Sequence, residues 1–175
     1  MDGNGKHVIV INGAGGVGKD TLCDMAAKEF RVLNVSSITP IKEIAKMCGW
    51  HGEKDDKARK FLSDLKRLTI DYNDFPTVKM KEEYDRFLLG DCELMFVHIR
   101  EGEEIDKFVR ATDGKAHTLL ILGGDRFKKA RLHSYGNASD DEVENYAYDY
   151  VFTNDKPIEE TKDNFIKFLR ENIMK

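Results

Sequence analysis

The sequence lacks any apolar run of about 18 residues, the length that a membrane-spanning helix needs. Its first residues, MDGNGKH, also lack the apolar core of a signal peptide. Cysteine is scarce: Cys23, Cys48 and Cys92 are odd in number and show no C-x-x-C spacing. We therefore expect reduced thiols in a cytoplasmic protein, with no membrane partner and no disulfide framework.

A basic excess is missing as well. The chain has 28 Lys and Arg against 32 Asp and Glu, a formal net charge of −4. That balance argues against a nucleic-acid polymer or a charged membrane surface as the partner. The 175 residues, 41% hydrophobic and 34% charged, suit one globular domain spanning residues 1–175.

Two kinds of catalytic signature are absent from the sequence. No Ser-His-Asp pattern supports nucleophilic catalysis. His98 has no His or Cys neighbour at metal-ligand spacing, so we expect it to be a buried, hydrogen-bonded core residue.

What the sequence does contain is a glycine-rich segment between a strand pattern and a helix pattern. An apolar run at residues 8–11 is typical of a buried strand, and apolar residues recur at helical spacing over residues 22–30. Between them, residues 13–21 read GAGGVGKDT. An ordinary glycine-rich turn is the alternative interpretation, and the flanking strand and helix favour a phosphate-binding loop.

The match to the loop pattern G-x-x-x-x-G-K-[ST] rests on Gly13, Gly18 and Lys19. Glycines let backbone N–H groups converge on an anion, and the helix N-terminus that follows favours negative charge. Lys19 supplies a point charge for the outer phosphates. Asp20 stands where Ser or Thr is expected and Thr21 follows one residue late, so both are candidate Mg²⁺ ligands. The expected ATP ligands in the loop are Gly13, Ala14, Gly15, Gly16, Val17, Gly18, Lys19, Asp20 and Thr21.

Strand and helix patterns alternate along the whole chain. Strands are predicted at Val8–Ile11, Val32–Ile38, Leu94–Ile99, Thr118–Leu122 and Tyr150–Thr153, with helical patterns between them and after the last. This order predicts an α/β fold in three layers, with a parallel five-stranded sheet and helices on both faces. We expect the helical segment 41–89, whose last helix is predicted at Thr77–Leu89, to be an insert on the acceptor side.

Ligands of parallel sheets lie beyond the carboxyl ends of the strands. Arg100 follows the third strand directly and is either a solvated strand end or an arginine aimed at a bound phosphate. Arg59 begins a long helical pattern whose other basic residues suit a solvated face, and it is the one we single out as a phosphate ligand. The basic cluster around Arg126 suits a surface helix or a lid over phosphates equally well.

Four motifs together resemble the P-loop nucleoside-monophosphate-kinase-like superfamily, within it the phage-type deoxynucleoside monophosphate kinases, and more loosely the animal phosphomevalonate kinases. They are Gly18-Lys19-Asp20 in the loop, Pro40-Ile41-Lys42 after the second strand, Arg100 after the third, and DYVFTN at residues 149–154. Only the loop motif is specific by itself. Two departures stand beside these motifs: Asp20 replaces the usual metal-binding hydroxyl of a phosphate-binding loop, and His98 stands where these relatives tend to carry Asp.

The resemblance implies a P-loop NTPase fold and transfer of the γ-phosphoryl group of ATP, with Mg²⁺, to a monophosphorylated small acceptor, in first place a (deoxy)nucleoside monophosphate. It implies catalytic roles for Lys19, Asp20 and Arg100. Ser37, Lys42, Arg59 and Arg100 would face the acceptor, and Arg126 and Asn154 would lie near the nucleotide. A nucleotide-binding sensor and a kinase of another phosphorylated metabolite remain the alternatives, and the chain is either a monomer or a homodimer.

Overall fold

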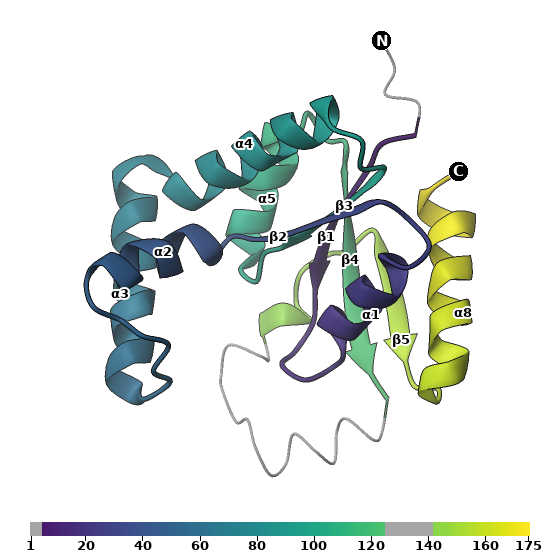
Figure 1. The fold of residues 1–175 in the computed structure, drawn as a ribbon, viewed down its shortest axis with the longest axis horizontal. Coiled ribbons are helices and arrows are strands. Elements are labelled where there is room, and N and C mark those ends of the chain that lie inside the picture. The colour runs from purple at the N-terminus through teal and green to yellow at the C-terminus, as the bar shows by residue number, and fades with distance from the viewer. Residues whose placement is uncertain (1–4, 125–141) are drawn as a thin grey trace.

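A computed structural model describes residues 5–124 and 142–175, and Arg126 with the predicted basic cluster lies outside these ranges. Five parallel strands form one sheet in the order β2-β3-β1-β4-β5 (Figure 1). The strands are β1 (His7–Asn12), β2 (Val32–Ser36), β3 (Leu94–His98), β4 (Ala116–Gly123) and β5 (Tyr150–Asn154). The parallel five-stranded sheet predicted from the alternating pattern is confirmed.

Helices cover both faces of this sheet (Figure 1). They are α1 (Lys19–Ala26), α2 (Thr39–Met47), α3 (Asp56–Asn73), α4 (Phe75–Leu89), α5 (Gly102–Ala111) and α8 (Ile158–Phe168), which runs into a π-helical turn, η1 (Leu169–Ile173). Helices α1 and α8 pack on one face, and α4 and α5 pack on the other. The segment 41–89 forms most of α2, all of α3 and α4, and α3 packs against α2 and α4.

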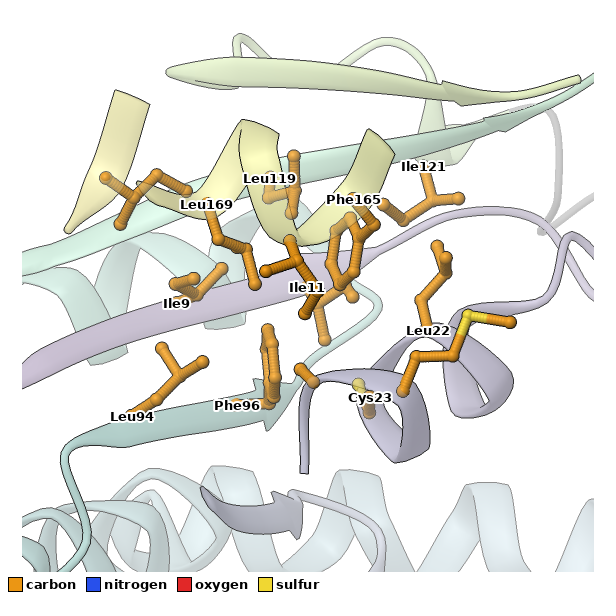
Figure 2. Close-up of a cluster of buried hydrophobic side chains, with 14 of the residues drawn as sticks. Ile9, Ile11, Leu22, Cys23, Leu94, Phe96, Leu119, Ile121, Phe165 and Leu169 are labelled. Atoms are coloured by element: carbon orange, nitrogen blue, oxygen red, sulfur yellow. The ribbon is translucent and has the colours of Figure 1, made fainter. Parts of the chain in front are cut away.

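The core holds the carboxyl ends of the strands in fixed positions. Because successive strand residues point to opposite faces, Ile9 and Ile11 join one apolar cluster while Val8 and Val10 join the other. Figure 2 shows the first cluster, where Phe165 of α8 and side chains of α1 pack against the strands. Full burial of side chains of this size stabilises the fold by about 1.5–3 kcal/mol each.

Several predicted boundaries were wrong by a few residues, for local reasons. β2 ends at Ser36 and not at Ile38, because Ser37 and Ile38 form a turn in which Ile38 already has helical angles. α1 ends at Ala26, and a turn in which the N–H of Phe30 donates to the Ala26 carbonyl (2.9 Å) follows it.

The corner between α3 and α4 was also misplaced. α4 begins at Phe75, two residues before the predicted Thr77, because Asp74 takes a left-handed conformation (φ 53°) that ends α3. The ammonium group of Lys107, on α5, lies 2.8 Å from the Asp74 carboxylate, and this ion pair ties the corner between α3 and α4 to α5. Neither of the described ranges, 5–124 and 142–175, contains a helix long and apolar enough to cross a membrane.

Candidate active site

The loop between β1 and α1 has the backbone that a phosphate-binding loop requires. A Cβ at Gly13 would lie 2.6 Å from the carbonyl oxygen of Ile121 on the neighbouring strand β4. Gly16 and Gly18 have positive φ angles of 78° and 90°, and Gly18 caps the N-terminus of α1. Any side chain at these three positions would clash or be strained, so the glycines are required by the fold of the loop itself.

We expect the substitution Gly13→Ala to lower the free energy of unfolding by about 1–3 kcal/mol, because the added methyl group must displace a backbone carbonyl of β4. Chemical denaturation measures this change. Gly90→Ala is the control and should cost less, since Gly90 has a φ of −89° and its added Cβ would lie 3.3 Å from the nearest carbonyl oxygen, that of Arg86. Equal stability of Gly13→Ala and the wild-type protein would contradict the close approach of loop and sheet.

Lys19, the first residue of α1, folds back over the loop. Its Nζ lies 2.5 Å from the carbonyl oxygen of Gly13 and 3.2 Å from that of Ala14. The ammonium charge is thereby held at the mouth of the loop, beside the N-terminal end of α1. The positive charge of Lys19 and the partial positive charge of the helix N-terminus both favour a bound anion. Asn154, at the end of β5, is buried and donates from Nδ2 to the carbonyl of Val17 (3.0 Å), so it holds the loop from the opposite side.

Asp20 and Thr21 lie exposed on the first turn of α1. In the part of the chain that the structure describes, no group of three or more Asp, Glu, His or Cys residues forms a metal cage. A Mg²⁺ ion accompanying ATP usually takes only one or two protein oxygens and completes its octahedron with phosphates and water. The carboxylate of Asp20 and the hydroxyl of Thr21 fit that limited role.

A cavity of about 470 Å³ lies beside the loop, at the carboxyl ends of β1 and β3 and under α3. It brings together five of the residues predicted from the sequence: Gly13, Lys19, Ser37, Arg59 and Arg100. Lys42 is exposed on α2 and is not part of this lining. The structure thus assembles the predicted acceptor residues around one space, with the exception of Lys42.

The lining of this cavity, the larger of two described here, is strongly cationic. Among the described residues that line it, Lys19, Arg59, Lys66 and Arg100 contribute four positive charges and Glu101 contributes one negative charge. A cavity with this charge excess concentrates anionic ligands, and the guanidinium groups can bind two oxygens of one phosphate.

The sequence analysis placed Lys66 with the other basic residues of its helix on a solvated face and did not predict its ion pair with Glu101. Nζ of Lys66 lies 2.6 Å from the Glu101 carboxylate, and the Lys66 side chain is only 14% exposed. This ion pair connects α3 to the residue that precedes α5. It therefore holds α3 in place as the wall of the cavity.

His98 stands between the larger cavity and a second one of about 350 Å³, since His98 and Ser36 line both. Its Nε2 lies 2.7 Å from Oδ1 of Asn34 and 3.8 Å from Sγ of Cys23. Burial lowers the pKa of His98 below its ordinary value of 6.5; the charge of Asp20 opposes this shift and that of Lys19 adds to it. The predicted hydrogen bond is present, but His98 is a half-buried cavity wall residue and not part of the core.

The sequence matches no protein-family model, and no curated protein is similar enough to count as a relative. Several solved structures nevertheless have a similar fold. The tunicamycin resistance protein of Deinococcus radiodurans superposes with a TM-score of 0.58 at 11% identity, over 95% of each chain. A putative kinase from Chloroflexus aurantiacus gives 0.54 at 10% identity over 96% of each chain. The guanylate kinase of Anaplasma phagocytophilum gives 0.52 at 17% identity, over 98% of this chain and 88% of that one.

These likenesses establish the fold. The chain has the three-layer α/β architecture of P-loop kinase structures, which confirms the predicted P-loop NTPase fold. Identities of 10–17% do not carry a substrate from one chain to another.

Proposed function

We propose that the protein is an ATP-dependent kinase that transfers the γ-phosphoryl group of ATP to the phosphate of a small monophosphorylated acceptor. One observation carries the proposal. Lys19, which belongs to the glycine loop, and Arg100, which follows β3, line the same cationic cavity. A donor site and an anion site are therefore adjacent, and phosphoryl transfer requires little beyond this positioning and charge neutralisation.

The residues divide between the two substrates. The loop and the N-terminus of α1 hold the ATP phosphates, and Lys19 neutralises charge on the outer ones. Arg59 and Arg100 hold the acceptor phosphate, whose oxygen attacks the γ-phosphorus while the bond to the β–γ bridging oxygen breaks and ADP leaves. Asp20 and Thr21 are the residues that would hold Mg²⁺, which would supply further charge neutralisation for the ATP phosphates.

The closing wall of the site belongs to α3. Lys66, fixed to Glu101 at 2.6 Å, keeps α3 over the cavity, and Leu62 of the same helix contributes an apolar side chain to the lining. A wall of this kind excludes water, which would otherwise compete with the acceptor for the γ-phosphoryl group.

The charge of the cavity supports an acceptor that carries a phosphate. Within that class, a (deoxy)nucleoside monophosphate is the first choice on the sequence resemblance. One structure of similar fold is a guanylate kinase, whereas others are named as a gluconokinase and a sugar kinase, so the fold by itself does not select the acceptor. Phosphomevalonate-like acceptors are the next class to test.

The experiment is an acceptor panel with the purified protein, MgATP and a coupled measurement of ADP release. The panel holds deoxynucleoside and nucleoside monophosphates, phosphorylated metabolites of the phosphomevalonate type, and gluconate as an unphosphorylated control. We expect at least one phosphorylated acceptor to raise the rate above that with ATP alone, and gluconate to leave it unchanged. A flat panel would remove the kinase proposal in favour of a nucleotide-binding sensor.

The role of Asp20 is tested through the Mg²⁺ dependence of ATP binding. If its carboxylate holds Mg²⁺, Asp20→Ala should raise the Mg²⁺ concentration for half-maximal ATP affinity by about tenfold, the loss of one oxygen ligand. Isothermal titration at a series of Mg²⁺ concentrations measures it, with Asp24→Ala, an exposed residue of the same helix, as control. Tighter ATP binding at low Mg²⁺ would instead show that Asp20 only repels the phosphates.

A further inference from the structure

Asn12, the last residue of β1, is buried at the junction of the two proposed substrate sites. Only 3% of its surface is exposed. Its Oδ1 accepts from the N–H of Gly13 (2.9 Å), and its Nδ2 donates to the carbonyl oxygen of Arg100 (2.8 Å) and to the hydroxyl of Tyr148 (2.9 Å). Both N–H bonds of the amide and its oxygen are thus engaged with the protein.

The three partners belong to three separate parts of the chain. Gly13 begins the glycine loop, Arg100 follows β3, and Tyr148 precedes β5. The Tyr148 hydroxyl donates in turn to the carbonyl of Val143 (2.7 Å), which anchors the chain that leads into β5. The side chain of Asn12 therefore joins the donor loop, the backbone of the acceptor arginine and the segment that leads into the last strand.

We propose that Asn12 is a positioning residue that sets the distance between the ATP-binding loop and Arg100. This inference rests on the proposed function, in which the two substrates meet between those elements. Asn12 also lines the larger cavity, but because its polar atoms are bonded to the protein it acts through Gly13 and Arg100. A displacement of about 1 Å between reacting groups costs about 10²-fold in rate, so such a connector has a large effect.

The substitution Asn12→Asp separates the two connections. The new carboxylate keeps an oxygen for the Gly13 N–H, and the Tyr148 hydroxyl can turn to donate to it, since a hydroxyl both donates and accepts. The Arg100 carbonyl only accepts, so it loses its donor and faces a negative oxygen instead. The variant should therefore disturb Arg100 and spare the loop.

The probe is inorganic phosphate, titrated by calorimetry into protein saturated with Mg²⁺ and a non-hydrolysable ATP analogue. We expect Asn12→Asp to weaken phosphate binding by about tenfold, with affinity for the ATP analogue changed by less than about threefold. Tyr148→Phe, which leaves the bonds from Asn12 to Gly13 and Arg100 intact, should change both affinities by less than about threefold. Thr118→Val is the control for a buried polar substitution outside the site, since Thr118 is 3% exposed and bonds to Asp149.

Two further readouts distinguish positioning from a general loss of structure. Protonation converts the new carboxyl group into a donor, and burial favours the protonated form, so the phosphate affinity of Asn12→Asp relative to wild type should recover as the pH falls. The double variant Asn12→Asp/Arg100→Ala should bind phosphate no more weakly than Arg100→Ala, because Asn12 acts through Arg100.

The failure of this inference is distinguishable from failure of the kinase proposal, because the titration needs no turnover. Additive losses in the double variant, a pH-independent defect, or equal loss of ATP and phosphate affinity would each overturn the positioning role. Absence of phosphate binding in the wild-type protein would overturn it too. If no acceptor raises the rate of ADP release but the phosphate titrations give the expected results, the kinase proposal is removed and the positioning role of Asn12 stands.

Discussion

Replacing Lys19 with alanine is expected to lower kcat/KM for ATP by about 10³-fold, the upper part of the range for loss of one preorganised charged donor. The reason is local. The Lys19 ammonium is held at the mouth of the glycine loop by the carbonyls of Gly13 and Ala14, and the proposal gives it the outer phosphates. Because Lys19 is not part of either apolar cluster, the variant should keep the stability of the wild-type protein.

The measurement combines steady-state kinetics with ATP varied, which gives kcat/KM, with calorimetric ATP titration and thermal unfolding. Lys28→Ala provides the control, since Lys28 is an exposed lysine just beyond the end of α1. We expect ATP affinity to fall in Lys19→Ala alone, with similar midpoints of unfolding for the three proteins. Unchanged ATP affinity in Lys19→Ala would show that the loop does not hold the nucleotide phosphates.

The second large effect concerns Arg100. Arg100→Ala should lower kcat/KM for the acceptor by about 10²–10³-fold and change ATP affinity by less than about threefold, because the guanidinium group is assigned to the acceptor phosphate only. The kcat/KM of Arg100→Lys for the acceptor should fall between those of the wild-type protein and Arg100→Ala. Lysine keeps the charge but lacks the planar guanidinium group that binds two oxygens.

Steady-state kinetics with each substrate varied in turn separates these effects. Arg110→Ala, which removes an exposed arginine in the last turn of α5, is the matched control and should behave as wild type. Equal losses for ATP and the acceptor in Arg100→Ala would mean that Arg100 is placed on the wrong substrate. Such a result would also remove the proposed role of the hydrogen bond between Asn12 and the Arg100 carbonyl in positioning the acceptor.

The glycine loop and its flanking elements could be predicted because their signal is local. Gly13, Gly18 and Lys19 carry the spacing, and the neighbouring strand and helix differ in their apolar period. The sequence could not show why Gly13 must be glycine. The atom that excludes a Cβ there is the carbonyl oxygen of Ile121, on a strand that meets β1 only in the folded sheet.

The contacts that could not be predicted from the sequence join residues that lie far apart along the chain. Asn12 and Tyr148 are 136 residues apart, His98 and Asn34 are 64 apart, and Lys66 and Glu101 are 35 apart. Each of them is an unremarkable polar residue in its own segment, and Lys66 in particular shares its helix with other basic residues that face solvent. Apolar periodicity shows which face of an element is buried, and it contains no information on which polar groups meet across elements.

The central claim is that this site transfers a phosphoryl group between two substrates and does not merely bind or hydrolyse ATP. The direct measurement uses ATP labelled in its γ-phosphate, together with whichever phosphorylated acceptor binds the protein, and follows the label. The account predicts label in the acceptor in an amount equal to the ADP formed, with transfer lost in Lys19→Ala and Arg100→Ala. Label found only in free phosphate, or remaining in ATP at every acceptor concentration, would contradict it.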